Sequence, residues 1–508
     1  MPVFSSLALE VPTDRVIVRL KGGAPALTKS AGEREALAAR LTGRTGELMR
    51  THRVMGDGAQ VMQLFRRLPA ARIKQLFAHL EHDAEVIEVV PDRLFFPAVD
   101  ATDPLYAWQW ALSATSGINA PGAWDISTGA NNLIIAIVDT GRLPHDDLAG
   151  RWIGGYDFVS LAERANDGGL RDADPADPGD WVTPAESASG TLQNCPVTDS
   201  RWHGTAMAGV IAATANNGSG IAGINWSSKL LPVRVVGKCG GYESDIADGI
   251  RWAAGIAVPG VPANADFADV LNVSLSAAGA CSTTLQSAIN EVLAVGTPII
   301  VAAGNNSVDA SGYSPGNCTG VITVGAVDRN GGKAGYTNFG SAVALSAPGG
   351  KSPEHFVGGD TQDNQWIFTT SNQGSTTPSA NNAYTRTDFG TSIATAQVTG
   401  IASLMLSVNP TLPPQFVKEI LQNTSRTFPT NTTALGSQAD CTTALCGSGI
   451  VQAATAARAA VRWGSAAPQV VGGLSGTMNF SVGLRSDGLV FVWGNKASGV
   501  GGMGSAAP

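Results

Sequence analysis

The feature that most constrains the fold is a short, uninterrupted apolar run that ends in a carboxylate. Leu133–Val138 reads L-I-I-A-I-V, and Asp139 follows directly. An apolar, β-branched run of this length predicts a strand buried on both faces, as in a parallel sheet that helices cover. Asp139 is then expected at the carboxyl end of the strand, the edge where ligands bind in open parallel sheets.

Two stretches of small residues predict helices that pack closely on such a sheet. The first, His203–Ala213, opens with a histidine, and the second, Ala394–Ala402, follows Ser392. The Ser392 hydroxyl is therefore expected at a helix N-terminus, where backbone N–H groups are free. Val301–Gly304 predicts the end of another strand, and Asn305 follows it into a turn.

These segments supply the groups needed to attack a peptide bond. A serine hydroxyl becomes an effective nucleophile when a base accepts its proton, and a third group must orient that base. Ser392, His203 and Asp139 can take these roles. The Asn305 side chain and the Ser392 backbone N–H can bind the negative oxygen of a tetrahedral intermediate. Each residue alone has an ordinary structural explanation, but the ordered set favours catalysis.

In this order and setting, the segments resemble the subtilases, the subtilisin-like serine peptidases, and in particular the secreted enzymes of Gram-negative bacteria. The resemblance covers about Asp103 to about Ala460, and the chain order Asp, His, Ser is that of subtilisin. It implies a doubly wound, mostly parallel α/β sheet. It also implies a secreted serine endopeptidase that acts through an acyl-enzyme on Ser392 and is made as a self-processing zymogen. An α/β-hydrolase esterase is disfavoured because it needs G-x-S-x-G and the order Ser, Asp, His.

The sequence departs from the family pattern at several positions. Ala206 replaces the second histidine that usually follows His-Gly-Thr, and Ala396 and Gln397 replace the usual Pro-His after the nucleophile. These departures support one alternative, a catalytically inactive subtilase fold that binds proteins. None of them removes a proton carrier or an oxyanion donor.

The resemblance also implies which residues bind substrate. Ser276 stands where the family usually has glycine, so it is expected to narrow the strand edge on which the substrate backbone pairs. The full set is Ser274, Leu275, Ser276, Ala303 and Gly304.

With 508 residues, the chain is expected to form two or three domains. Residues 1–101 predict a small α+β domain, and residues 102–462 the peptidase domain. The resemblance implies that the first domain is a propeptide, which assists folding and then inhibits; the alternative is an N-terminal domain that is never removed. Its expected strands and helices are Val16–Lys21, Ala31–Leu48, Ala70–Leu80 and Ala84–Val90.

Residues 463–508 predict a short β-rich extension. Phe480–Arg485 and Leu489–Trp493 flank Ser486-Asp487-Gly488, which is a hairpin signal. The segment resembles the start of a propeller repeat of the regulator of chromosome condensation type. A single repeat cannot close a propeller, so we expect the natural protein to continue. The alternative is a short extension lying on the peptidase body.

Six cysteines without C-x-x-C spacing predict disulfides rather than zinc or redox chemistry, and hence export. No signal peptide is visible at Met1–Phe4, and no run is long enough for a membrane span. Either a signal was removed or the chain stays inside the cell; the disulfides and the propeptide favour removal, so we expect secretion. Spacing alone leaves the pairing open. The resemblance implies the pairs Cys195–Cys239, Cys281–Cys318 and Cys441–Cys446.

Catalysis by these groups needs no cofactor, but the acidic loop Asn166–Asp180 is a candidate for structural calcium, which prefers six to eight oxygen ligands. The alternative is a solvated loop whose carboxylates cap turns. A formal net charge of −8 argues against a nucleic-acid partner, so the expected partners are protein substrates and the chain's own propeptide. The candidate calcium ligands are Asp167, Asp172, Asp174, Asp177 and Asp180.

Overall fold

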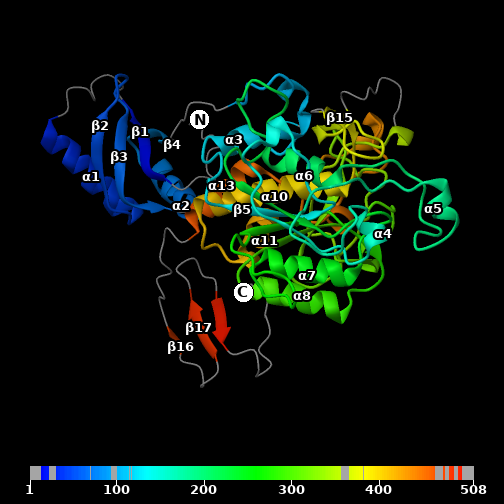
Figure 1. Cartoon of the computed structure of the whole chain (residues 1–508). Coiled ribbons are helices and arrows are strands. Elements are labelled where there is room, and N and C mark those ends of the chain that lie inside the picture. The colour runs from blue at the N-terminus through cyan, green and yellow to red at the C-terminus, as the bar shows by residue number, and fades with distance from the viewer. Residues whose placement is uncertain are drawn as a thin grey trace. The chain divides into compact units, whose positions relative to one another are not determined.

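The computed structural model describes most of the chain as two compact units, Met1–Pro97 and Ala98–Pro508. Figure 1 shows both, coloured from blue at the N-terminus to red at the C-terminus. The described residues are 13–21, 30–68, 70–92, 100–113, 115, 117–355, 365–380, 383–463, 473–474, 480–484 and 490–494.

The N-terminal unit is a four-stranded antiparallel sheet with two helices, as the α+β prediction expected. Its sheet order is β2-β3-β1-β4. Helix α1 begins with a capping box, in which Ser30 and Glu33 satisfy each other's backbone N–H groups, and it ends at Gly46 with φ of 70°. The second and third strands along the chain, β2 and β3, were not predicted. The elements are β1 (Thr13–Leu20), α1 (Ala31–Thr45), β2 (Met49–Val54), β3 (Gln60–Leu68), α2 (Ala70–Glu81) and β4 (Val86–Pro91).

The second unit is built on a seven-stranded sheet in the order β13-β12-β10-β8-β5-β7-β6. Every neighbouring pair in this sheet is parallel, which confirms the predicted sheet. The strands are β5 (Ile134–Asp139), β6 (Tyr156–Asp157), β7 (Lys229–Arg234), β8 (Val270–Val273), β10 (Ile299–Ala302), β12 (Ile322–Val327) and β13 (Leu345–Pro348).

The strand order reverses at β5. From β5 the chain first builds β6 and β7 on one side and then continues through β8, β10, β12 and β13 on the other. Such a switch point leaves a crevice at the carboxyl ends of the neighbouring strands. Asp139 is the last residue of β5 and therefore lies at this switch point.

Helices cover both faces of this sheet, and Figure 1 shows α7 and α8 side by side on one of them. Each face has its own buried apolar cluster. Helices α7 and α8 contribute to one cluster, and α3, α6, α10, α11 and α13 to the other. Their bounds are α3 (Ala120–Trp124), α6 (His203–Ala212), α7 (Glu243–Ala253), α8 (Thr283–Ala294), α10 (Thr391–Val408), α11 (Pro414–Asn423) and α13 (Ala453–Arg462).

Helix α10 is the central helix of this unit. Fifteen of its residues, between Thr391 and Leu406, are buried. In the described part of the chain it is also the one helix long and apolar enough to cross a membrane, but 83% of that stretch is buried inside the protein. Its apolar character is that of a core helix.

Short elements join this framework. A hairpin of β14 and β15 packs on α6, and β9 pairs with β11 in antiparallel fashion. The bounds are α4 (Ala162–Ala165), α5 (Pro184–Ala188), β9 (Ala277–Ala278), β11 (Tyr313–Ser314), β14 (Ile367–Ser371), β15 (Ala383–Asp388) and α12 (Thr443–Cys446).

Beyond residue 470 the described residues form three antiparallel strands, β16 (Gly473–Leu474), β17 (Phe480–Leu484) and β18 (Val490–Gly494). The pairing of β17 with β18 is the one that the hairpin signal predicted. Its turn, residues 486–488, lies outside the described residues.

Candidate active site

Asp139 is fully buried at the end of β5. Its Oδ1 accepts a hydrogen bond from the backbone N–H of the next residue, Thr140, at 2.8 Å. This bond fixes one carboxylate oxygen against the strand end and helps to offset the cost of burying the charge.

His203 is the first residue of α6, and its ring lies against the Asp139 carboxylate. The Nδ1 atom is 2.8 Å from Asp139 Oδ1 and 2.9 Å from Oδ2. The carboxylate accepts, so the hydrogen-bond network assigns the proton to Nδ1 and leaves Nε2 as the basic nitrogen. The His203 side chain remains 24% exposed, whereas the Asp139 carboxylate is fully buried.

Ser392 is the second residue of α10, at the N-terminus of the core helix, as predicted. Its hydroxyl donates to the backbone carbonyl of Ser274 at 3.2 Å, and the Ser274 hydroxyl donates to the Ser392 carbonyl at the same distance. Ser274 directly follows β8. The nucleophile candidate is thus tied to the carboxyl edge of the sheet.

Asn305 is held beside Ser392 by Thr391. Its Oδ1 accepts from the Thr391 backbone N–H at 2.9 Å and from the Thr391 hydroxyl at 2.8 Å. With the oxygen committed to these two donors, Nδ2 is the free, donating end of the amide. Sequence reasoning missed the role of Thr391, although it lies within the Gly-Thr-Ser motif itself.

A small space next to Gly390 lies between two donors. A Cβ atom at Gly390 would lie 3.4 Å from Asn305 Nδ2 and 3.7 Å from the Ser392 backbone nitrogen. Gly390 has φ of 151°, a conformation that favours glycine, so no side chain fills the space. Two nitrogens that can donate to the same point are what a developing oxyanion requires.

The predicted substrate-binding residues come from two neighbouring strand ends. Ala303 and Gly304 follow β10, and a Cβ at Gly304 would lie 3.1 Å from Ser276 Oγ and 2.4 Å from Asn338 Nδ2. Gly304 also has φ of 101°. The structure therefore brings Ser276 next to Gly304, with no room for a side chain between them. Leu275, half-buried, precedes the exposed Ser276.

The departures from the family pattern have structural partners. The Thr369 hydroxyl, on β14, donates to the carbonyl of Ala206, and the Thr370 hydroxyl donates to the carbonyl of Thr205 at 2.7 Å. The buried Gln397 donates from Nε2 to the carbonyl of Pro348 at the end of β13. The bond at Ala206 uses only its backbone carbonyl, whereas Gln397 links the core helix to β13 through its side chain. The Asp139–His203 contact is present beside both departures.

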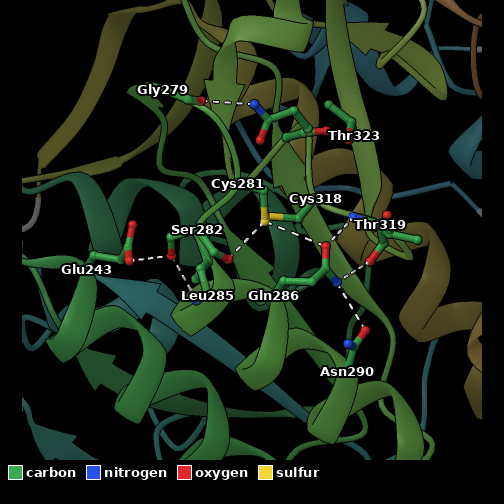
Figure 2. The surroundings of a disulfide bond; sticks show 12 residues. Glu243, Gly279, Cys281, Ser282, Leu285, Gln286, Asn290, Cys318, Thr319 and Thr323 are labelled. Atoms are coloured by element: carbon green, nitrogen blue, oxygen red, sulfur yellow. Dashed lines mark hydrogen bonds between the residues drawn. A yellow bond between two sulfur atoms is a disulfide. The ribbon is translucent and has the colours of Figure 1, made fainter.

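The three disulfides pair as the resemblance implied, which confirms that prediction. Figure 2 shows the Cys281–Cys318 bond beside the first turn of α8, which Ser282 caps. Gln286 on α8 also bonds to the residue after Cys318, because its amide exchanges hydrogen bonds of 2.8 and 3.1 Å with the backbone of Thr319. The complete set is Cys195–Cys239, Cys281–Cys318 and Cys441–Cys446.

The acidic loop does not gather its carboxylates as the calcium prediction required. In the described part of the chain, no group of three or more His, Cys, Asp or Glu side chains could hold a metal ion. Asp167 and Asp180 pair with Arg234 and Arg201, and burial raises the pKa of Asp177 to about 7. The other two, Asp172 and Asp174, each accept from a backbone N–H two residues ahead. Calcium binding here stays a prediction without a ligand cluster to support it.

The model of the subtilase family matches residues 130–449, which include all four candidate catalytic residues. The chain belongs to the subtilase family. Two curated relatives of this subtilase are extracellular enzymes. The extracellular protease of Xanthomonas campestris pv. campestris is 38% identical over 474 residues, covering 91% of this chain and 76% of the relative. The extracellular basic protease of Dichelobacter nodosus is 36% identical over 422 residues, covering 82% and 67%.

A solved structure agrees with both the fold and the family. A protease from Pseudoalteromonas arctica matches with a TM-score of 0.64 and 43% sequence identity, covering 71% of this chain and 100% of that one. The subtilase described here is therefore a subtilisin-like serine endopeptidase, and protein chains are its substrates.

Proposed function

We propose that this subtilase is a secreted endopeptidase, made as a self-processing zymogen, that cleaves peptide bonds through an acyl-enzyme on Ser392. The observation that carries the proposal is the pairing of His203 Nδ1 with the buried Asp139 carboxylate. The pair makes Nε2 the basic nitrogen of the imidazole, and Ser392 begins the core helix at the carboxyl edge of the same sheet.

In the first step, the Ser392 hydroxyl turns from the Ser274 carbonyl to His203 Nε2 and gives up its proton as Oγ attacks the substrate carbonyl carbon. Asp139 holds the imidazole in the correct tautomer and stabilises the imidazolium that forms. The former carbonyl oxygen becomes negative. Asn305 Nδ2 and the Ser392 backbone N–H donate to it next to Gly390.

Collapse of this intermediate breaks the peptide bond. His203 returns the proton to the leaving amine, and the acyl group stays on Ser392 Oγ. A water molecule then loses its proton to His203 and attacks the acyl carbon. The bond between that carbon and Ser392 Oγ breaks, which releases the second product, and His203 returns the proton to Oγ.

Secretion and self-processing are supported by different features. All six cysteines are in disulfides, and such bonds persist in oxidising, extracellular environments. Two relatives are named extracellular proteases. A separate compact unit, Met1–Pro97, precedes the peptidase unit, as a removable propeptide would.

The test is the substitution Ser392→Ala. It should abolish casein hydrolysis and prevent release of residues 1 to about 101, because both reactions need the same nucleophile. Intact mass spectrometry of the secreted protein measures the second effect. Ser341→Ala, at an exposed serine before β13, is the matched control and should be processed normally.

Two further measurements separate the possible failures. A fluorophosphonate probe should label the wild type at Ser392 and leave the alanine variant unlabelled; folded wild type that stays unlabelled would favour a binding protein. Adding a trace of active enzyme to the alanine variant should release the N-terminal segment. Normal processing of Ser392→Ala without added enzyme would overturn self-cleavage.

A further inference from the structure

The acidic loop Asn166–Asp180 has an interpretation other than metal binding, because it is bonded to the segments that carry Asp139 and His203. Its key residue is Asp177, which is only 3% exposed. Asp177 Oδ1 accepts from the Gly179 backbone N–H at 2.9 Å, and its Oδ2 accepts from the Thr140 hydroxyl at 2.6 Å.

Thr140 connects this carboxylate to the catalytic pair. It directly follows Asp139, and its hydroxyl oxygen accepts from the backbone N–H of Gly204 at 3.0 Å. Gly204 directly follows His203. The Thr140 hydroxyl thus donates to the loop and accepts from the start of α6. The backbone N–H of Thr140 donates to Asp139.

The packing at this junction leaves little freedom. A Cβ at Gly204 would lie 2.3 Å from the carbonyl oxygen of Gly141 and 3.3 Å from Asp139 Cβ. The strand end and the helix N-terminus therefore touch backbone to backbone, and the Thr140 hydroxyl is the polar link across the contact.

Two more bonds fasten the loop beside the same pair. Asp180 accepts from the backbone N–H of Arg201 at 2.9 Å and from its guanidinium at 2.8 and 3.0 Å, two residues before His203. Asp167 pairs at 2.7 Å with Arg234, the residue that lies opposite Asp139 in the neighbouring strand β7. Charge-assisted hydrogen bonds of this kind are stronger than neutral ones and hold geometry well.

We propose that Thr140 and Asp177 are positioning residues for the Asp139–His203 pair, and that the loop Asn166–Asp180 is the bracket that holds them. The inference rests on the proposed catalytic roles of Asp139 and His203. Neither positioning residue touches substrate. They act by fixing the end of β5 against the start of α6, so that the imidazole keeps its place relative to Ser392.

A bracket of this kind has a distinct kinetic signature. The substrate-binding residues follow β8 and β10 and share no hydrogen bond with Thr140 among those described. Loosening the bracket should therefore lower kcat and leave KM unchanged. A displacement of about 1 Å in a catalytic group can cost about a hundredfold in rate.

The experiment compares Thr140→Val, which keeps the shape and removes both hydrogen bonds, with Thr140→Ser, which keeps the hydroxyl. The full-length secreted enzyme is used, and its active sites are counted with a fluorophosphonate probe. With a peptide p-nitroanilide substrate, Thr140→Val should lower kcat by about 10- to 100-fold without a change in KM. Thr140→Ser should remain close to the wild type.

A spectroscopic readout separates positioning from general damage. The Nδ1–H proton of His203 in its bond to Asp139 should give a downfield NMR signal in the wild type and in Thr140→Ser. The signal should broaden or shift in Thr140→Val. Should Thr140→Val fail to fold, Asp177→Asn provides the second variant, because it can still accept from Gly179 but no longer offers a carboxylate to Thr140.

The control is Asp174→Asn, at an exposed loop residue whose carboxylate only accepts from the Ala176 backbone N–H at 3.1 Å. It should keep the wild-type kcat, with and without a calcium chelator. Unchanged kcat in Thr140→Val, or an equal loss in Thr140→Ser, would overturn the inference. An equal loss in Asp174→Asn or after chelation would identify the loop as a calcium site instead. A wild type that the probe does not label would contradict the proposed function itself.

Discussion

Replacing Asn305 with alanine tests the chemistry of the site most directly. The structure provides two donors next to Gly390, Asn305 Nδ2 and the Ser392 backbone N–H, and the substitution removes one of them. Loss of one such donor from subtilisin lowers kcat by about 10²–10³-fold, equivalent to about 3–4 kcal/mol of transition-state stabilisation. We expect the same loss here with little change in KM, since the donor acts on charge that is absent from the bound substrate.

The expected effect on stability is moderate. Asn305 is exposed, but the Thr391 N–H and hydroxyl that lose their acceptor belong to a fully buried residue. Because a buried donor left without a partner costs about 1–3 kcal/mol, the free energy of unfolding should fall by about that amount. Steady-state hydrolysis of a peptide p-nitroanilide, normalised by active-site titration, measures kcat and KM, and thermal denaturation measures stability.

Asn306→Ala is the matched control. This exposed neighbour has the same side chain, and its backbone N–H, which the substitution keeps, donates to Asn338 at 2.9 Å. The control should retain wild-type kcat. The reasoning would be refuted if Asn305→Ala kept kcat within about tenfold of the wild type, or raised KM at constant kcat, because the amide would then bind substrate and transition state alike.

Other predictions concern stability and are best measured in a catalytically inactive background to prevent autolysis. Removing the Cys195–Cys239 disulfide, which spans 44 residues, should cost about 4 kcal/mol by chain entropy, against about 2 kcal/mol for Cys441–Cys446, which spans 5. Urea denaturation of the two double-alanine variants checks the order, and equal losses would contradict it. Burial raises the pKa of Asp177 from 3.8 to about 7, so the folded protein holds this proton more tightly than the unfolded chain. The stability that it contributes is therefore lost as pH rises from about 4 to about 7, and Asp177→Asn should flatten that part of the pH profile; an unchanged slope would be the contrary result.

The central sheet and both catalytic helices could be predicted because their local patterns are unambiguous. The apolar run before Asp139 forms β5, and the small residues after His203 form α6 to within one residue of the predicted end. The second predicted helix, Ala394–Ala402, is longer in the structure, where α10 spans Thr391–Val408.

Strand β2 of the N-terminal unit was missed for a physical reason. Residues Met49–Val54 read M-R-T-H-R-V, and only Met49 is buried. With one face open to solvent and few apolar residues, β2 shows no clear alternation, and pairing with β3 stabilises it. Alternation of apolar and polar residues predicts a strand because one face of the strand is buried. A strand that is stabilised mainly by backbone pairing shows little alternation and is hard to predict.

The sequence left two interpretations of the acidic loop open because the partners of its carboxylates lie far along the chain. Asp177 bonds to Thr140, 37 residues away, and Asp180 bonds to Arg201, 21 residues away. The aspartates are close together in the sequence, but the donors that bond to them come from other segments of the chain. The partners of Asp167, Asp177 and Asp180, which are guanidinium and hydroxyl groups of the same chain, could not be predicted from the spacing of the aspartates.

The position of Ser392, the proposed nucleophile, on the core helix has a consequence for adaptation to temperature. Ser392 begins a helix that is buried over most of its length, with Gly400 packed so closely on Ile224 that a Cβ there would approach it to 2.8 Å. The serine cannot gain local freedom without disturbing the packing of the whole peptidase unit. Heat inactivation should therefore coincide with loss of the entire fold, and a cold-active or heat-resistant descendant must be tuned through the loops around the cleft, while this helix stays unchanged.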